Sequence, residues 1–441
     1  MEKAIALAEK VYYVYSKLPN FLKKVIKFFY WILKGVYRLL RKVYHLFVKK
    51  KKVNNSISEN KVMIVENILE EGDYIVERKL KKGKYKISWI IPRPIKGSGG
   101  HRNFYRVIRY LASQGHDVTV YIDYKLSFSP DPCTSGKQAH NFIKENFFDL
   151  GASIIYGTDN IEKCDMLVAT HYESAYIVKE NEDKAKKCFY FIQDYESYFT
   201  AMGDEFIRAY QSYKLGLYPI TSGPWPLTFL KRDFGVNYGY YFRFPLNREV
   251  YYYNGETKEK NSIVFFAKPN MPRRCYKLGL EALTIVKEKM PETKIYFFGE
   301  NSSSYCNVPF DFVACGLVPT IEELGDLYRK CLVGLAFSTT NPSLVPFEML
   351  SCGTAVVDLD FNDNEVNYGS RDNITLAEPF ADKIAEKVIE LLKDEKLRSK
   401  KVKNGMEFCK IFPSEKEMCE GIEKEIIRVT NSKEKKVGEN K

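Results

Sequence analysis

The chain has 441 residues, 45% of them hydrophobic, and this length exceeds what one hydrophobic core usually covers. Its net charge of +12 lies within residues 1–52, which carry 14 Lys or Arg and two acids, so the remaining chain is formally neutral and has no general excess of basic residues for nucleic acid. Ten cysteines are scattered without CxxC or His-paired spacing, which disfavours a disulfide framework and a zinc site.

Residues 1–52 form a basic amphipathic segment in which positive charges such as Lys10, Lys17 and Lys24 recur every seven residues beside an apolar, aromatic face. Charges interrupt every apolar run before the roughly 20 residues needed to cross a bilayer. We therefore expect a helical segment that lies on an anionic membrane surface, with the protein cytoplasmic and peripheral on the inner face of the cell membrane. A solvated or partner-binding helix is the alternative.

Residues 53–82 are expected to be a linker, and from residue 86 short apolar strands alternate with amphipathic helices. This alternation predicts a parallel sheet with helices on both faces, in a Rossmann-like domain over residues 83–250. The expected strands are 87–91, 118–122, 153–156, 166–169, 189–192 and 218–220, with a helix over 101–113.

The alternation starts again at residue 263, which predicts a second Rossmann-like domain over residues 251–413. Its expected strands are 263–267, 295–298, 312–315, 332–337 and 355–359; its expected helices are 277–289, one capped by Thr320 and Glu323, one from about 346, and 379–393. A C-terminal helix over 414–430 and a disordered tail over 431–441 complete the chain. The fold class is thus α/β, with two doubly wound domains facing a cleft into which the loops after the strands project.

A glycine-rich loop, Gly97-Ser98-Gly99-Gly100, follows the first strand and directly precedes a helix. Glycines let backbone N–H groups approach an anion at the start of a helix. The spacing is not the dinucleotide pattern GxGxxG, but Asp123 stands where an NAD enzyme would hold a ribose, so an NAD-dependent oxidoreductase is an alternative. The glycines also suit a merely flexible loop.

Polar residues follow two further strands of the first domain: His171 comes after one, and Gln193, Asp194, Tyr195 and Glu196 come after the other. A histidine near its neutral pKa could orient or deprotonate an acceptor hydroxyl there. Structural roles are open alternatives, namely a hydrogen-bonded histidine and carboxylates that cap the following helix.

Three basic residues, Lys268, Arg273 and Arg274, follow the first strand of the second domain. Their charges could neutralise a departing diphosphate, a role that suits the planar guanidinium group. A solvated turn is the alternative, because Pro269 and Pro272 mark a loop.

The stretch from Asn341 to Asp358 is the most informative part of the sequence. It reads as a loop, a short helix that ends at Gly353 and an apolar strand. Backbone N–H groups at the helix start, near Ser343, Leu344 and Val345, would receive phosphate, and Glu348 could accept both hydroxyls of a ribose.

These residues resemble the signature of retaining GT-B glycosyltransferases of family 4, in which two glutamates eight positions apart hold the donor sugar and the ribose. Glu348 matches the second glutamate, and Met349, Cys352 and Gly353 match the run that follows it, whereas Thr340 stands in place of the first glutamate. The segment Phe191-Ile192-Gln193-Asp194-Tyr195-Glu196 resembles bacterial rhamnosyltransferases of surface-glycan and rhamnan synthesis.

The resemblance implies metal-independent transfer of a sugar with retention, from a nucleotide sugar to a growing glycan, with no cofactor. Because the amphipathic segment would place the cleft near the membrane surface, we expect the glycan to be lipid-linked. L-Rhamnose from dTDP-L-rhamnose is the implied donor, bound by residues 251–413, with the acceptor bound by residues 83–250. The alternatives are the oxidoreductase and a catalytically inactive GT-B scaffold that binds glycan or a partner protein. We expect His171 and Asp194 to be catalytic; Gly99, Gly100, Lys268, Arg273, Arg274, Ser343, Leu344, Val345 and Glu348 to bind the donor; and His101, Gln193, Tyr195 and Glu196 to bind the acceptor.

Overall fold

The computed structural model describes residues 71–124 and 133–432. The amphipathic segment expected over residues 1–52, most of the expected linker, and residues 433–441 of the expected tail lie outside this range. No helix among the described residues is long and apolar enough to cross a membrane.

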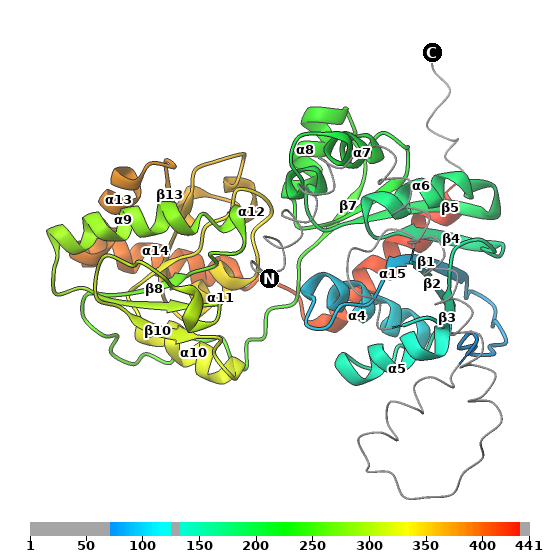
Figure 1. Cartoon of the computed structure of the whole chain (residues 1–441), viewed down its shortest axis with the longest axis horizontal. Coiled ribbons are helices and arrows are strands. Elements are labelled where there is room, and N and C mark those ends of the chain that lie inside the picture. The colour runs from blue at the N-terminus through cyan, green and yellow to red at the C-terminus, as the bar shows by residue number, and fades with distance from the viewer. Residues whose placement is uncertain (1–70, 125–132, 433–441) are drawn as a thin grey trace, which may run out of the picture. The chain divides into compact units, whose positions relative to one another are not determined.

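The first sheet has seven parallel strands in the order β3-β2-β1-β4-β5-β6-β7 (Figure 1). This order reverses between β1 and β4, which is the switch point where open α/β sheets bind ligands. The strands are β1 Lys86–Pro92, β2 Asp117–Asp123, β3 Ser153–Tyr156, β4 Cys164–Ala169, β5 Ala185–Ile192, β6 Tyr218–Ser222 and β7 Tyr240–Phe242.

Helices cover both faces of this sheet, so the carboxyl halves of its central strands β4 and β5 are apolar and buried. In β1, Trp89 and Ile91 pack toward one face, with α4, α5 and α15, whereas Ile90 packs toward the other, with α6, α7 and α8. We call this sheet and its helices the N-terminal domain. The helices are α4 Gly99–Ser113, α5 Gly136–Asn146, α6 Tyr172–Glu180, α7 Asp204–Ser212, α8 Trp225–Phe234 and α15 Glu415–Asn431.

Helix α15 returns from the end of the chain to the first sheet. Its apolar stripe, Met418, Cys419, Ile422, Ile426 and Val429, is buried in the same core as α4 and β1. Polar contacts surround this stripe: Glu423 lies 2.9 Å from His116, and Arg109 lies 2.7 Å from Glu415. The helix expected over residues 414–430 is therefore part of the N-terminal domain, although it follows the second sheet in sequence.

The second sheet has six parallel strands in the order β10-β9-β8-β11-β12-β13, and its order reverses between β8 and β11. Helices α9 and α13 pack in one core with this sheet, and α10, α11 and α14 pack in another. We call this the C-terminal domain. Its strands are β8 Ser262–Phe266, β9 Lys294–Phe298, β10 Val313–Gly316, β11 Val333–Leu335, β12 Ala355–Leu359 and β13 Thr375–Ala377; its helices are α9 Tyr276–Lys289, α10 Ile321–Lys330, α11 Val345–Ser351, α12 Glu365–Tyr368, α13 Ala381–Lys393 and α14 Glu395–Cys409.

The expected fold of two doubly wound parallel α/β domains is confirmed, with most strand positions correct within two residues. Sequence reasoning did not find β7, β13 or α14, and it gave no positions for helices α5, α6, α7, α8 and α12. The two strands have only three residues each, and α14 buries only Gly405 and Cys409, so it shows almost no apolar periodicity. Within the expected linker, Tyr74 forms an antiparallel bridge with Ile154 of β3.

The core position of α15 can be tested with Ile422→Ala, since this side chain is 0% exposed. Replacing a buried isoleucine with alanine leaves a cavity and lowers the free energy of unfolding by about 2–5 kcal/mol. We expect a loss of this size in urea unfolding followed by tryptophan fluorescence. Lys424→Ala, at an exposed position of the same helix, is the control and should change stability by less than about 0.5 kcal/mol. Equal stabilities of the two variants would contradict the packing.

Candidate functional site

The candidate site lies at the carboxyl ends of the two sheets, where loops from both domains form hydrogen bonds with one another. In the C-terminal domain the loops after β8 and β11 flank the switch point, and they are joined because Thr339 N donates to Arg273 O at 3.1 Å. In the N-terminal domain the residues after β5 and β6 meet the loop after β11. The site is thus built from both domains.

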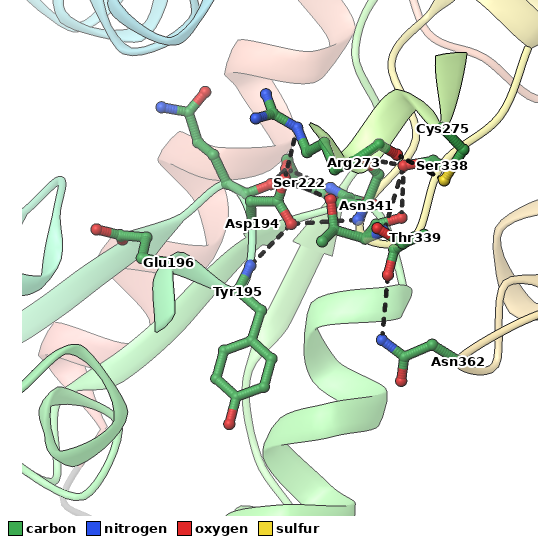
Figure 2. A network of polar contacts seen from close by, with 12 residues as sticks. Asp194, Tyr195, Glu196, Ser222, Arg273, Cys275, Ser338, Thr339, Asn341 and Asn362 are labelled. Carbon is green, nitrogen blue, oxygen red and sulfur yellow. Dashed lines mark hydrogen bonds and ion pairs between the residues drawn. The ribbon is translucent and has the colours of Figure 1, made fainter. Parts of the chain in front are cut away.

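Asn341 is the centre of this contact (Figure 2). Its side-chain amide donates to Gln193 O at 2.9 Å and to Ser222 O at 2.7 Å, so one asparagine of the C-terminal domain bonds two strand ends of the N-terminal domain. Its backbone N–H donates to Asp194 Oδ1 at 3.1 Å. Asn341 is 7% exposed, and a buried amide without partners would be costly, so these bonds fix the position of the loop.

Asp194 is held in the same network and faces the basic loop. Its Oδ1 also accepts from Tyr195 N at 2.8 Å, and its Oδ2 accepts from Thr340 Oγ1 at 3.0 Å. Arg273 Nε lies 3.9 Å from Oδ2. Burial raises the pKa of Asp194 above its ordinary value, and the bonds from Tyr195 N and Asn341 N and the charge of Arg273 act against this rise.

A second buried carboxylate, Asp358 at the end of β12, supports the loop from behind. It accepts from Ser338 N at 2.9 Å, from Asn364 at 2.7 Å and from the Tyr368 hydroxyl at 2.7 Å. Ser338 Oγ in turn donates to Thr340 O at 2.9 Å. Sequence reasoning gave Asp358 no role; the signal available was an acid inside a fully apolar strand, which requires partners when buried.

Three polar groups of the expected donor site are buried without a hydrogen-bond partner among the described residues: Arg273 Nε, Arg274 Nε and Ser343 Oγ. Arg274 is 6% exposed, and burial lowers its pKa below the ordinary value for arginine. Buried polar groups in native proteins are nearly always hydrogen-bonded, so these three donors, which belong to the loops after β8 and β11 beside the switch point, suit an anionic ligand.

Lys268 differs from the two arginines because its ammonium group already has partners. It donates to Gly299 O at 2.6 Å and lies 3.4 Å from the Glu300 carboxylate, both after β9. The positive charge of this lysine is thus partly balanced within the C-terminal domain.

Glu348 lies in the first turn of α11, as expected, and is half-buried. Its carboxylate has one weak contact, with the Tyr328 hydroxyl at 3.5 Å. Burial raises the pKa of Glu348 to about 7, since little compensates for the loss of water around the charge. Leu344 is the N-cap of this helix and Val345 its first residue.

The glycine-rich loop begins α4 as expected, with Gly99 and Gly100 in its first turn and Ser98 as the N-cap. His101 is 5% exposed; its ring contacts Ser98 Oγ at 2.8 Å and Arg93 O at 2.9 Å, and burial lowers its pKa to about 4. Gln193 donates to Gly100 O at 3.2 Å. His101 thus shapes the loop after β1 as a neutral ring.

His171 lies after β4, with its Nε2 3.9 Å from Asp123 Oδ2 and 3.9 Å from Glu173 Oε2. Burial and the nearby His101 lower the pKa of His171 to about 3, so it is neutral and a weak base at pH 7. It can therefore orient a hydroxyl but is poorly suited to deprotonate one. Glu173, which sequence reasoning missed, has its pKa raised to about 7 by burial and by Asp123.

Tyr195 and Glu196 have structural partners. Tyr195 is 3% exposed and its ring stacks on Phe229 at 4.3 Å between centroids, so it offers a glycan little surface. Glu196 accepts from Tyr172 N at 2.8 Å and from the Tyr190 hydroxyl at 2.9 Å. It therefore caps α6, a helix that precedes it, rather than the helix that follows.

Comparison with known proteins agrees with this two-domain architecture. The family described as "WsaF, C-terminal domain" matches residues 261–389, which include β8, α11 and the loops between them. The O-antigen biosynthesis protein RfbC of Myxococcus xanthus is 31% identical over 248 residues, which is 55% of this chain and 19% of that protein. The chain thus spans about a fifth of the length of this curated relative.

Solved structures share the whole architecture at low sequence identity. HepE from Anabaena in complex with UDP matches with a TM-score of 0.59 and 11% identity, over 77% of this chain and 99% of HepE. Sucrose-phosphate synthase from Thermosynechococcus elongatus matches with a TM-score of 0.57 and 13% identity, over 78% and 99% of the two chains. The chain therefore has the GT-B glycosyltransferase fold, with two Rossmann-like domains.

Proposed function

We propose that this protein is a glycosyltransferase that moves a sugar from a nucleoside diphosphate sugar to a hydroxyl of a growing surface glycan. The set of buried donors on Arg273, Arg274 and Ser343 that have no hydrogen-bond acceptor among the described residues carries the proposal. It lies beside the switch point of the C-terminal domain, where α/β sheets bind ligands, and its charge and geometry suit a diphosphate. Glu348 would accept hydrogen bonds from the ribose of the same ligand.

The proposed reaction needs no protein nucleophile. The bond between C1 of the sugar and the oxygen of the β-phosphate breaks, and the acceptor oxygen bonds to C1 on the same face, so configuration is retained. The acceptor proton passes to the departing phosphate oxygen. Arg273 and Arg274 stabilise the charge that develops on the diphosphate, and we propose that no metal ion is needed for this.

We propose L-rhamnose from dTDP-L-rhamnose as the donor and a lipid-linked glycan as the acceptor. The resemblance of residues 191–196 to rhamnosyltransferases supports the sugar, and the similarity of more than half of the chain to an O-antigen biosynthesis protein supports a surface glycan. The neutral His171, with Asp123 and Glu173 near it, would orient the acceptor hydroxyl.

Nucleotide binding can be tested by thermal stabilisation with dTDP, dTDP-L-rhamnose, UDP, GDP and NAD, since a ligand that binds the folded state raises Tm. We expect a shift with dTDP and dTDP-L-rhamnose. Glu348→Ala should weaken binding roughly 10- to 150-fold, because a hydrogen bond to a charged group contributes about 1.5–3 kcal/mol. Glu288→Ala, at an exposed position of α9, is the control and should bind as the wild type does.

Each other outcome of this panel has a defined meaning. A shift with UDP or GDP alone would keep the enzyme class and change the sugar, whereas a shift with NAD alone would favour an oxidoreductase. No shift with any nucleotide would contradict the proposal. Binding without any hydrolysis or transfer of the sugar would identify an inactive scaffold.

The pH dependence of nucleotide affinity is a second test, because the pKa of Glu348 is about 7. The 3′-hydroxyl of the deoxyribose bonds more strongly to the ionised carboxylate than to the protonated form, so affinity should rise as pH increases from about 6 to 8. Glu348→Gln has no carboxyl group to titrate, and its affinity should be lower and flat over this range. Calorimetric titration of dTDP-L-rhamnose, whose diphosphate has no group that titrates in this range, measures both profiles at several pH values; parallel profiles would contradict the role of Glu348.

We also propose that residues 1–52 hold the protein at an anionic membrane surface, on the basis of their 14 basic and two acidic residues. Lysines near an anionic leaflet contribute about 1 kcal/mol each. Replacing Lys49, Lys50, Lys51 and Lys52 by Gln should therefore weaken sedimentation with phosphatidylglycerol vesicles, and salt should do the same. The control replaces four exposed lysines of α13 and α14, Lys393, Lys396, Lys400 and Lys403. Equal binding of the two variants would contradict the proposal.

A further inference from the structure

We infer that Asp194 of the N-terminal domain is the carboxylate that binds a hydroxyl of the donor sugar. The inference rests on the proposed function and adds to it that the sugar subsite is completed across the domain contact. The C-terminal domain would bind the nucleoside diphosphate, and Asp194 of the N-terminal domain would bind the sugar and select it.

The first step is the composition of the loop after β11. Residues 338–344, Ser-Thr-Thr-Asn-Pro-Ser-Leu, contain no acid, and Thr340 stands eight positions before Glu348. A pyranose presents hydroxyl donors, and carboxylates bind such donors strongly. This loop cannot supply that group, but its Thr340 hydroxyl donates to Asp194 Oδ2 at 3.0 Å, so a carboxylate lies directly against the loop.

The second step is the position of Asp194 relative to the cationic residues. Arg273 Nε lies 3.9 Å from Asp194 Oδ2 and is one of the buried donors without a hydrogen-bond partner among the described residues. A diphosphate bound by Arg273 therefore places its attached sugar beside this carboxylate. The charges of both Arg273 and Arg274 oppose the rise in the pKa of Asp194, so both arginines lie within electrostatic range of this acid.

The third step is the acceptor capacity of the carboxylate. Oδ1 accepts two backbone N–H groups, from Tyr195 and Asn341. Oδ2 accepts one hydrogen bond among the described residues, from Thr340, and so has room for another donor. Residues of both domains fix the position of this carboxylate. A group that discriminates between sugars must be held in a fixed position.

A purely structural role for Asp194 is the competing explanation, because the network also joins the domains. The structure contains a matched acid for comparison: Asp363 pairs with Arg232 of α8 at 2.5 Å, across the same two domains but at an exposed position. A residue that only joins the domains should affect every ligand of the site alike. Replacing a residue that binds the sugar should change the affinity only for ligands that carry a sugar.

The test compares Asp194→Asn with Asp363→Asn by calorimetric titration of dTDP and dTDP-L-rhamnose, and of UDP and UDP-glucose. Asn keeps the size of the side chain and an oxygen for the two backbone N–H groups, but removes the charge. For the pair that the wild type binds, we expect Asp194→Asn to lose roughly 10- to 100-fold in affinity for the nucleotide sugar. Its affinity for the nucleoside diphosphate without the sugar should stay within about two-fold of the wild-type affinity. Asp363→Asn should bind both ligands of the pair as the wild type does.

A swap of the acid between domains gives a second variant. Asp194→Ser combined with Thr340→Glu returns a carboxylate to the same place from the other side, and we expect it to recover part of the nucleotide-sugar affinity that Asp194→Ser alone loses. Equal losses for both ligands in Asp194→Asn, or unchanged nucleotide-sugar affinity, would overturn the inference. If the wild type bound none of the four ligands, the proposed function itself would fail.

Discussion

The hydrogen bonds around Asn341 set the geometry on which the candidate site depends. This side chain is almost fully buried, and its amide reaches the ends of two strands in the other domain, at Gln193 and Ser222. An unpaired buried amide is costly, so the loop after β11 is held where these acceptors are. The same placement brings Thr340 to Asp194 and Thr339 to the backbone of Arg273. Residues that we expect to bind the donor and residues that we expect to bind the acceptor thus share one network.

The energetic cost of burying a charge is offset differently for the acids of this network and for its cations. Asp358 accepts four hydrogen bonds, two of them from backbone N–H groups, and therefore serves as an anchor. The guanidinium groups of Arg273 and Arg274 have buried Nε donors that no acceptor among residues 71–124 and 133–432 satisfies. A protein tolerates such groups where a ligand completes their hydrogen bonds, which is why we propose the diphosphate beside the cations rather than beside the acids.

The sequence indicated that most residues of the candidate site follow strands, but it did not show their surroundings. His171 and Asp194 were recognised because parallel strands place the residues that follow them at one edge. The sequence did not show that burial lowers the pKa of His171 to about 3, or that the ring of Tyr195 is buried against Phe229. These properties depend on neighbours distant in the chain. Short strands and the polar helix α14 were missed because their residues carry too little apolar pattern.

The sequence by itself determined the alternation of strands and helices, the two domains and the basic N-terminal segment, because periodicity and charge are local properties. Only the tertiary structure decided which elements share a core and which side chains meet. It placed α15 against the first sheet, more than 300 residues from α4, and it set Asp194 beside Thr340, 146 positions away. Such contacts depend on burial and hydrogen bonding between distant segments, which no local pattern encodes.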